Sequence, residues 1–119
     1  MKILIVDDDI DFLSMIDDFL IGFDFELAIA SQFKDALKYA KAFKPDVAIL
    51  DYLMRGDKGT GVNLARKLKI IDPTVKLILV TGTIIREHYE EDLFMKKFKK
   101  PLNLKCLKSS LDRMKNMVA

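Results

Sequence analysis

The sequence of 119 residues has one cysteine, no long apolar run and little net charge. Because Cys106 has no partner within the chain, nothing points to disulfides or to an oxidising compartment. No stretch approaches the roughly 20 apolar residues of a membrane span, and the apolar start at residues 3–6 is too short for a signal peptide. These absences predict a cytoplasmic protein that does not associate with a membrane.

The formal net charge of +2 is too small to indicate a surface that binds nucleic acid or a membrane. Lysines do gather late in the chain, and we interpret them as a solvated basic face without direct nucleic-acid contacts. The acidic cluster near the start is more informative, because like charges packed together are best tolerated when a cation lies among them. This cluster consists of Asp7, Asp8, Asp9 and Asp11.

Length and composition fit a single globular domain over residues 1–119. Half of the residues are hydrophobic and 32% are charged, which is an ordinary balance for a globular protein. A chain of this length can bury a core without disulfides or a structural metal. No internal repeat, linker or low-complexity stretch divides it.

Short apolar segments alternate with segments of helical periodicity. The apolar segments are rich in branched and aromatic residues, as in strands buried on both faces of a parallel sheet, and the last one is diluted by lysines. The predicted strands are residues 3–6, 25–30, 47–50, 75–80 and 94–98. The predicted helices run from Ile10 to about Gly22, from Phe33 (after Ser31 as N-cap) to before Pro45, from Val62 to Pro73, and from Leu104 to Met114, with a short polar helix between Thr83 and Glu91.

This alternation requires right-handed crossovers and predicts a parallel sheet with helices on both faces. Five such units in this length fit the flavodoxin-like, doubly wound α/β fold with strand order 2-1-3-4-5. In such sheets the functional site lies beyond the carboxyl ends of the strands, where the strand order reverses. The residues that follow the predicted strands are therefore the candidates for function.

Charged and hydroxyl residues follow four of the five predicted strands. Asp7 and Asp8 follow the first strand, and Asp51 follows the third. Thr81 follows the fourth strand, and Lys100 follows the fifth. Taken singly, each has a simpler explanation as a turn, a helix cap or a surface lysine. Their joint placement at one edge of the sheet is far harder to obtain by chance.

This set of side chains suits phosphoryl transfer. Three neighbouring carboxylates could not all stay ionised unless a hard divalent cation such as Mg²⁺ neutralised them. A carboxylate can also act as a nucleophile toward phosphorus and form an acyl phosphate. The transferring group needs donors for its negatively charged oxygens, and Lys100 and Thr81 would supply an ammonium and a hydroxyl.

Over essentially its whole length the sequence resembles the receiver domains of two-component response regulators. The resemblance implies a signalling phosphoacceptor that catalyses only its own phosphorylation and dephosphorylation, and so is not an enzyme in the usual sense. It implies a sensor histidine kinase or phosphotransfer protein as donor and a downstream effector as output. The matching motifs are the acidic pair Asp7 and Asp8, Asp51 in Ala48-Ile49-Leu50-Asp51, Thr81 before Gly82, and Lys100-Pro101.

By this resemblance, Asp51 is the phosphorylated residue and Mg²⁺ assists it. A cis peptide is expected before Pro101. The implied metal ligands are Asp8, Asp51 and the backbone carbonyl of Leu53, with Asp7 acting mainly through a water, and the implied contacts of the phosphoryl oxygens are Thr81 and Lys100.

The chain departs from the family pattern at Lys97, where receivers commonly have an aromatic switch residue. We expect Lys97 to keep its charge in water, so that output depends on displacement of residues 82–86. The one histidine, His88, is predicted to be a surface residue and not a phosphorelay histidine.

Two other classes of protein remain open. A Mg²⁺-dependent phosphatase with a strand-end aspartate nucleophile normally has a second aspartate two residues on, and Leu53 at that position argues against this class. A degenerate receiver that serves only for interaction is the other, favoured by Lys97 and by the short segment between Thr81 and Lys100.

Overall fold

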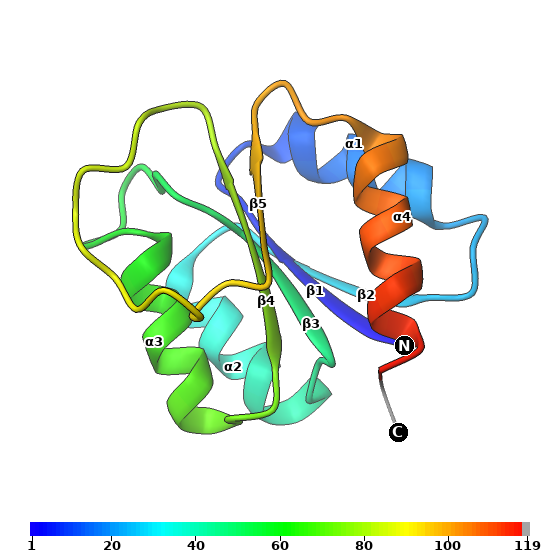
Figure 1. Ribbon diagram of the computed structural model, residues 1–119, viewed down its shortest axis with the longest axis horizontal. Helices are drawn as coiled ribbons and strands as arrows, with labels where there is room; N and C mark the ends of the chain where they lie inside the picture. Colours follow the sequence, from blue (N-terminus) through cyan, green and yellow to red (C-terminus); the bar gives the residue numbers. More distant parts are fainter. Residues whose placement is uncertain (118–119) are drawn as a thin grey trace.

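The computed structural model describes residues 1–117, in which strands and helices alternate over most of the chain (Figure 1). The strands are β1 (Lys2–Val6), β2 (Glu26–Ala30), β3 (Val47–Asp51), β4 (Lys76–Thr81) and β5 (Lys96–Lys99). The helices are α1 (Ile10–Leu20), α2 (Phe33–Phe43), α3 (Gly61–Ile71) and α4 (Leu104–Lys115). None of the helices in this described part is long and apolar enough to cross a membrane.

The sheet has the predicted topology. All five strands are parallel and lie in the order β2-β1-β3-β4-β5. Helices α1 and α4 cover one face of the sheet, and α2 and α3 cover the other (Figure 1). The strand order reverses between β1 and β3, so their carboxyl ends form the edge at which a functional site is expected.

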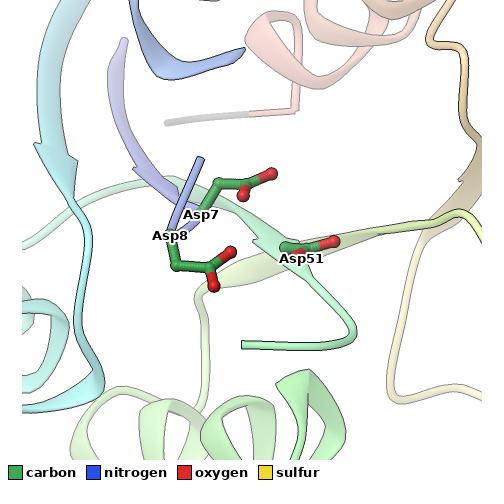
Figure 2. Close-up of side chains that lie close together, drawn as sticks. All are labelled: Asp7, Asp8 and Asp51. Atoms are coloured by element: carbon green, nitrogen blue, oxygen red, sulfur yellow. The ribbon is translucent and has the colours of Figure 1, made fainter. Parts of the chain in front are cut away.

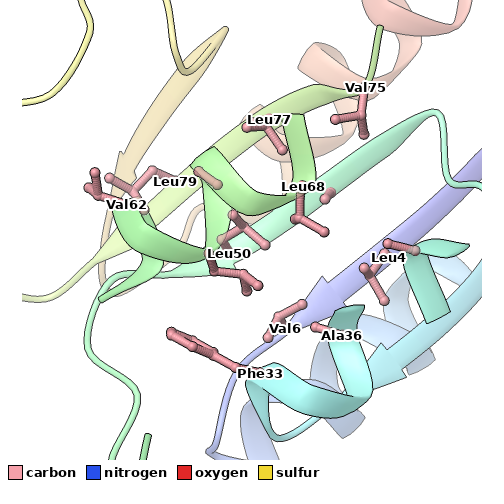
Figure 3. Packing of buried hydrophobic residues seen from close by; sticks show 14 of the residues in the cluster. Leu4, Val6, Phe33, Ala36, Leu50, Val62, Leu68, Val75, Leu77 and Leu79 are labelled. Atoms are coloured by element: carbon pink, nitrogen blue, oxygen red, sulfur yellow. The ribbon is translucent and has the colours of Figure 1, made fainter. Parts of the chain in front are cut away.

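The central strands are almost continuously apolar because helices cover both of their faces. Successive side chains point to opposite faces, so Leu50 joins the cluster under α2 and α3, whereas Ile49 joins the cluster under α1 and α4. Figure 3 shows the first cluster, in which Leu68 of α3 and Ala36 of α2 lie over the sheet. This close packing gives the strand ends a rigid support.

The caps of α1 and α2 differ in kind. Asp9 caps α1 locally, since its carboxylate accepts hydrogen bonds from two backbone N–H groups of the first turn. The prediction that Ser31 caps α2 is wrong, because Gln32 holds that position and makes no side-chain capping bond. Asp57, in the loop after β3, instead accepts a hydrogen bond from the Phe33 N–H at 3.3 Å. A tertiary contact thus takes the place of the local cap.

The predicted short helix between Thr83 and Glu91 is also wrong. Residues 82–95, which we call the strap, contain no helix and run from the carboxyl end of β4 to the amino end of β5 (Figure 1). Contacts with the neighbouring α3, and not hydrogen bonds between successive helical turns, hold this segment. The strap is fastened to α3, where the Thr60 hydroxyl donates to Glu87 at 2.7 Å and Arg66 pairs with Glu90 at 3.1 Å.

Candidate functional site

Three carboxylates meet where β1 and β3 end. Asp7 and Asp8 follow β1, and Asp51 is the last residue of β3, which pairs directly with β1. One carboxylate oxygen from each of these residues lies within 4.8 Å of the others (Figure 2). Asp7 is 1% exposed and Asp51 7% exposed, while Asp8 is half-buried. Register and topology therefore bring together the acidic residues that the sequence placed at two strand ends.

Burial makes two of these carboxylates, Asp7 and Asp51, harder to ionise. Burial raises the pKa of Asp51 to about 6, and the negative charge of Asp7 adds to the increase. Burial also raises the pKa of Asp7, although a hydrogen bond from the Asp9 backbone and the contact with Lys100 oppose the increase. The three carboxylates are thus costly to ionise together, and a cation among them would remove that cost.

Lys100 supplies one positive charge to this cluster. Its Nζ lies 3.0 Å from Asp7 Oδ2 and 3.2 Å from Asp51 Oδ1. Burial by itself lowers the pKa of Lys100, but the contacts with the two carboxylates outweigh burial and raise this pKa above its ordinary value. The Lys100–Pro101 peptide is cis, as predicted. An ammonium group thus lies directly beside the Asp51 carboxylate.

An open cavity of about 840 Å³ lies over the carboxylates. Leu53 lines it, and its backbone is held by a bridge to Thr60. Asp8 Oδ2 accepts a hydrogen bond of 2.8 Å from the backbone N–H of Arg55, which ties the same loop to the acidic cluster. The residues that could hold a metal, Asp7, Asp8, Asp51 and the Leu53 carbonyl, therefore offer only oxygen atoms, the ligand type of Mg²⁺.

Thr81 is the one predicted site residue that is turned away. It ends β4 next to Asp51, but its hydroxyl donates to the carbonyl of Thr83 at 3.0 Å and accepts from the Thr83 N–H at 3.1 Å. Thr81 lines a neighbouring cavity together with Tyr89 and Lys97 and does not line the cavity over the carboxylates. In this conformation the Thr81 hydroxyl bonds to the loop that follows β4 and not to the acidic cluster.

A family model described as the response regulator receiver domain matches residues 3–112. The chain belongs to this family. It is a receiver domain, with a phosphoacceptor role in two-component signalling, and receivers interact with kinases and effector domains. A search of curated proteins found no match.

Solved structures of receivers have the same fold at low sequence identity. A receiver from Methanospirillum hungatei JF-1 is 24% identical with a TM-score of 0.78, and the alignment covers 98% of each chain. The receiver of an HD domain-containing protein from Pseudomonas fluorescens Pf-5 is 20% identical with a TM-score of 0.88, covering 98% of this chain and 94% of that one. The chemotaxis protein CheY4 of Vibrio cholerae is 23% identical with a TM-score of 0.81, covering 95% and 97%. At these identities the likeness concerns the fold alone.

Sequence reasoning missed three supports of the receiver site. The Arg55 N–H orients Asp8, and the Phe12 ring lies 4.5 Å below the Lys100 ammonium. At Gly61, a Cβ atom would collide with the backbone oxygen of Asp51. A glycine at the first position of a helix was a usable signal, because glycine is rarely chosen there unless another chain segment approaches closely. The other two contacts leave no local signal.

Proposed function

We propose that Asp51 accepts the phosphoryl group of this receiver. The observation that supports this most is the position of Asp51, a buried carboxylate beside the Lys100 ammonium and under an open cavity. A donor phosphohistidine would present its phosphorus from that cavity. The bond from an Asp51 oxygen to phosphorus forms as the P–N bond breaks, and the electron pair of that bond returns to the histidine nitrogen.

The metal of the reaction would be Mg²⁺, held by Asp8, Asp51 and the Leu53 carbonyl, with Asp7 acting through a water. The oxygen-only donor set and the close approach of the carboxylates within 4.8 Å support this assignment. When bound, Mg²⁺ neutralises the carboxylates and the charge on the phosphoryl oxygens. Asp8 is already oriented by the Arg55 N–H, so the metal would meet a partly preformed site.

Lys100 and Thr81 would contact the phosphoryl oxygens. Lys100 needs little movement, because its ammonium already lies 3.2 Å from Asp51. Thr81 has to release the Thr83 carbonyl before its hydroxyl can donate to a phosphoryl oxygen. This release would connect phosphorylation to the strap, which begins at the next residue.

We further propose that residues 1–119 act as one receiver between two partners. The donor would be a sensor histidine kinase or a phosphotransfer protein, and an effector protein or domain would read the phosphorylated state. Kinases of this kind draw the phosphoryl group from ATP, which fits an exchange in the cytoplasm.

The test is the substitution Asp51→Asn, treated with acetyl phosphate and Mg²⁺ and followed by intact mass. The amide keeps the shape of the side chain but is a poor nucleophile, so we expect labelling of the wild type and none of the variant. Asp11→Asn, a nearby exposed aspartate, is the matched control and should label normally. Equal labelling of Asp51→Asn and wild type would refute the assignment, and no labelling of the wild type would favour an interaction-only receiver.

A further inference from the structure

The two edges of the sheet differ in charge. β5, at one edge, has lysine at three of its four positions, and lysines on an edge strand discourage pairing with a further strand. β2 forms the other edge, where residues 23–30 read Phe-Asp-Phe-Glu-Leu-Ala-Ile-Ala and contain no lysine, arginine, proline or glycine. The lysines that protect the edge at β5 are therefore missing at β2.

The outer side of β2 exposes hydrogen-bonding groups of the backbone. The Glu26 N–H donates to the carbonyl of Met1 at 3.0 Å, so the backbone groups of Glu26 face β1. Because these groups alternate along a strand, those of Leu27 and Ile29 face outward, where no other strand among residues 1–117 pairs with them. Two donors and two acceptors are thus available to another strand.

An apolar stripe follows the same edge. Successive side chains of a strand point to opposite faces, so Phe25, Leu27 and Ile29 share the face that α1 and α4 cover. Phe25 and Leu27 are only partly buried there, and Ile29 is 42% exposed. Phe23, just before the strand, is 41% exposed. A second strand laid along this edge would remove apolar surface from water and so gain free energy.

We propose that β2 pairs antiparallel with β2 of a second copy of this chain, about a two-fold axis at Ala28. A two-fold axis makes the interface closed, so association stops at the dimer. In this register Leu27 of each copy lies opposite Ile29 of the other, and the two pairs exchange four backbone hydrogen bonds. The side chains of these pairs would join into one apolar patch across the axis.

Charge favours this arrangement and a second copy as the partner. A parallel, in-register pair would place Glu26 against the same residue of the other copy, whereas the antiparallel pair places it opposite Ala30. The acidic end of each strand, with Asp24 and Glu26, would then run beside the start of α2 in the other copy, where Lys34 is exposed. The edge is therefore complementary to itself in hydrogen bonds, apolar surface and charge.

This dimer goes beyond the proposed function and does not depend on it. No residue of β2 lines the cavity over Asp51, so pairing of β2 leaves the carboxylate accessible. Self-association and the labelling of Asp51 can therefore fail separately.

The first test is disulfide cross-linking of cysteine variants of the full chain that also have Cys106→Ser, which removes the one native thiol. Ala28 would face its counterpart in a pair without backbone hydrogen bonds, where the Cα atoms are about 4.5 Å apart and a disulfide can form. Mild oxidation should therefore cross-link Ala28→Cys into a dimer. Glu26→Cys, which lies opposite Ala30, is the matched control and should stay monomeric on a denaturing gel.

The second test is sedimentation velocity over a concentration series, in which the wild type should dimerise reversibly. Ile29→Lys should weaken the association by about tenfold or more, because each copy loses an apolar contact and brings a charge to the interface. The matched control is Ile70→Lys, the same substitution at an isoleucine of α3 that is 82% exposed, and it should leave the association unchanged. Circular dichroism checks the fold of both variants.

Three outcomes would overturn the proposal. The first is a wild type that stays monomeric at every concentration, which would leave the edge to a different protein. The second is equal association of Ile29→Lys and the wild type, which would place the dimer interface away from β2. The third is faster cross-linking of Glu26→Cys than of Ala28→Cys, which would exclude the antiparallel register.

Discussion

Asp51 lies beside two other carboxylates and one ammonium group. The carboxylates raise the pKa of Asp51, whereas the ammonium group lowers it. Burial raises the pKa of Asp51 to about 6, and the contact with Lys100 only partly offsets burial and the repulsion from Asp7. In the absence of a metal, the ionised Asp51 carboxylate therefore destabilises the folded state. This destabilisation is what a bound cation would relieve.

This balance predicts a pH-dependent effect of Asp51→Asn on stability in EDTA. The folded pKa of about 6 lies above the unfolded value near 3.8, so the folded state holds the proton longer and wild-type stability falls as the pH rises between these values. Above pH 6 we expect the variant to be more stable than the wild type by roughly 1–3 kcal/mol, and below about pH 4 this difference should disappear. Urea unfolding across the pH range measures it. A difference that is constant with pH would contradict the electrostatic account.

At the scale of elements, the loop after β3 joins the acidic cluster to α2. The Arg55 N–H binds Asp8, and the Asp57 carboxylate caps α2 at the Phe33 N–H. A negative charge at this position also interacts favourably with the helix dipole. The loop that carries Leu53 is thus held at two points, one in the acidic cluster and one at the start of α2.

We therefore predict that Asp57→Ala destabilises the protein by about 1 kcal/mol, the usual loss on removal of a helix cap. The measurement is the free energy of unfolding in urea. Lys58→Ala, at an exposed neighbouring position, is the control and should change stability little. Equal stability of both variants would mean that the contact of 3.3 Å contributes nothing to α2.

The strap is the element most directly joined to the site, through Thr81 and its hydrogen bonds to Thr83. Lys97 is exposed, as expected, and its ammonium lies 2.9 Å from the Tyr89 hydroxyl of the strap. The Lys97 ammonium is therefore held by a polar partner in the wall of the cavity that Thr81 also lines.

On this basis we predict that beryllofluoride bound at Asp51 displaces residues 82–86 and leaves Lys97 outside. Thr81 turns toward the added anion and releases Thr83, so the start of the strap has to move. Amide hydrogen exchange with and without beryllofluoride should change most at residues 82–86, and a structure of the complex would locate Lys97. Inward rotation of Lys97 with an unmoved strap start would contradict this prediction.

At the scale of the whole molecule, Mg²⁺ should act as a stabilising ligand, because the site proposed for it is a cluster that exists only in the folded state. At about ten times the Kd, such a ligand adds about 1.4 kcal/mol, enough to raise the Tm by several °C. We predict this rise for the wild type and its loss in Asp8→Ala, while Asp11→Ala keeps it. Thermal melts with Mg²⁺ and with EDTA measure the difference. A Tm of the wild type that does not respond to Mg²⁺ would contradict the metal assignment.

The fold and the acidic cluster were predictable because they depend on patterns that local sequence expresses. Short apolar runs that alternate with helical periodicity leave few topologies, and the topology then places the strand-end residues Asp7, Asp51 and Lys100 at one edge. Asp9 was predictable as a cap because its partners are two and three residues away. For these features the sequence by itself was sufficient.

Only the tertiary structure decided the rest, because the deciding contacts join residues far apart in the chain. The cap of α2 comes from Asp57, 24 residues after the Phe33 N–H that it binds, so the local candidate Ser31 was not used. The strap contains no helix, and contacts of its side chains with Thr60 and with Arg66 of α3 hold it, whatever its own helix propensity. The orientation of Thr81 and the pairing or lack of pairing of each lysine likewise depend on neighbours that folding alone brings within reach.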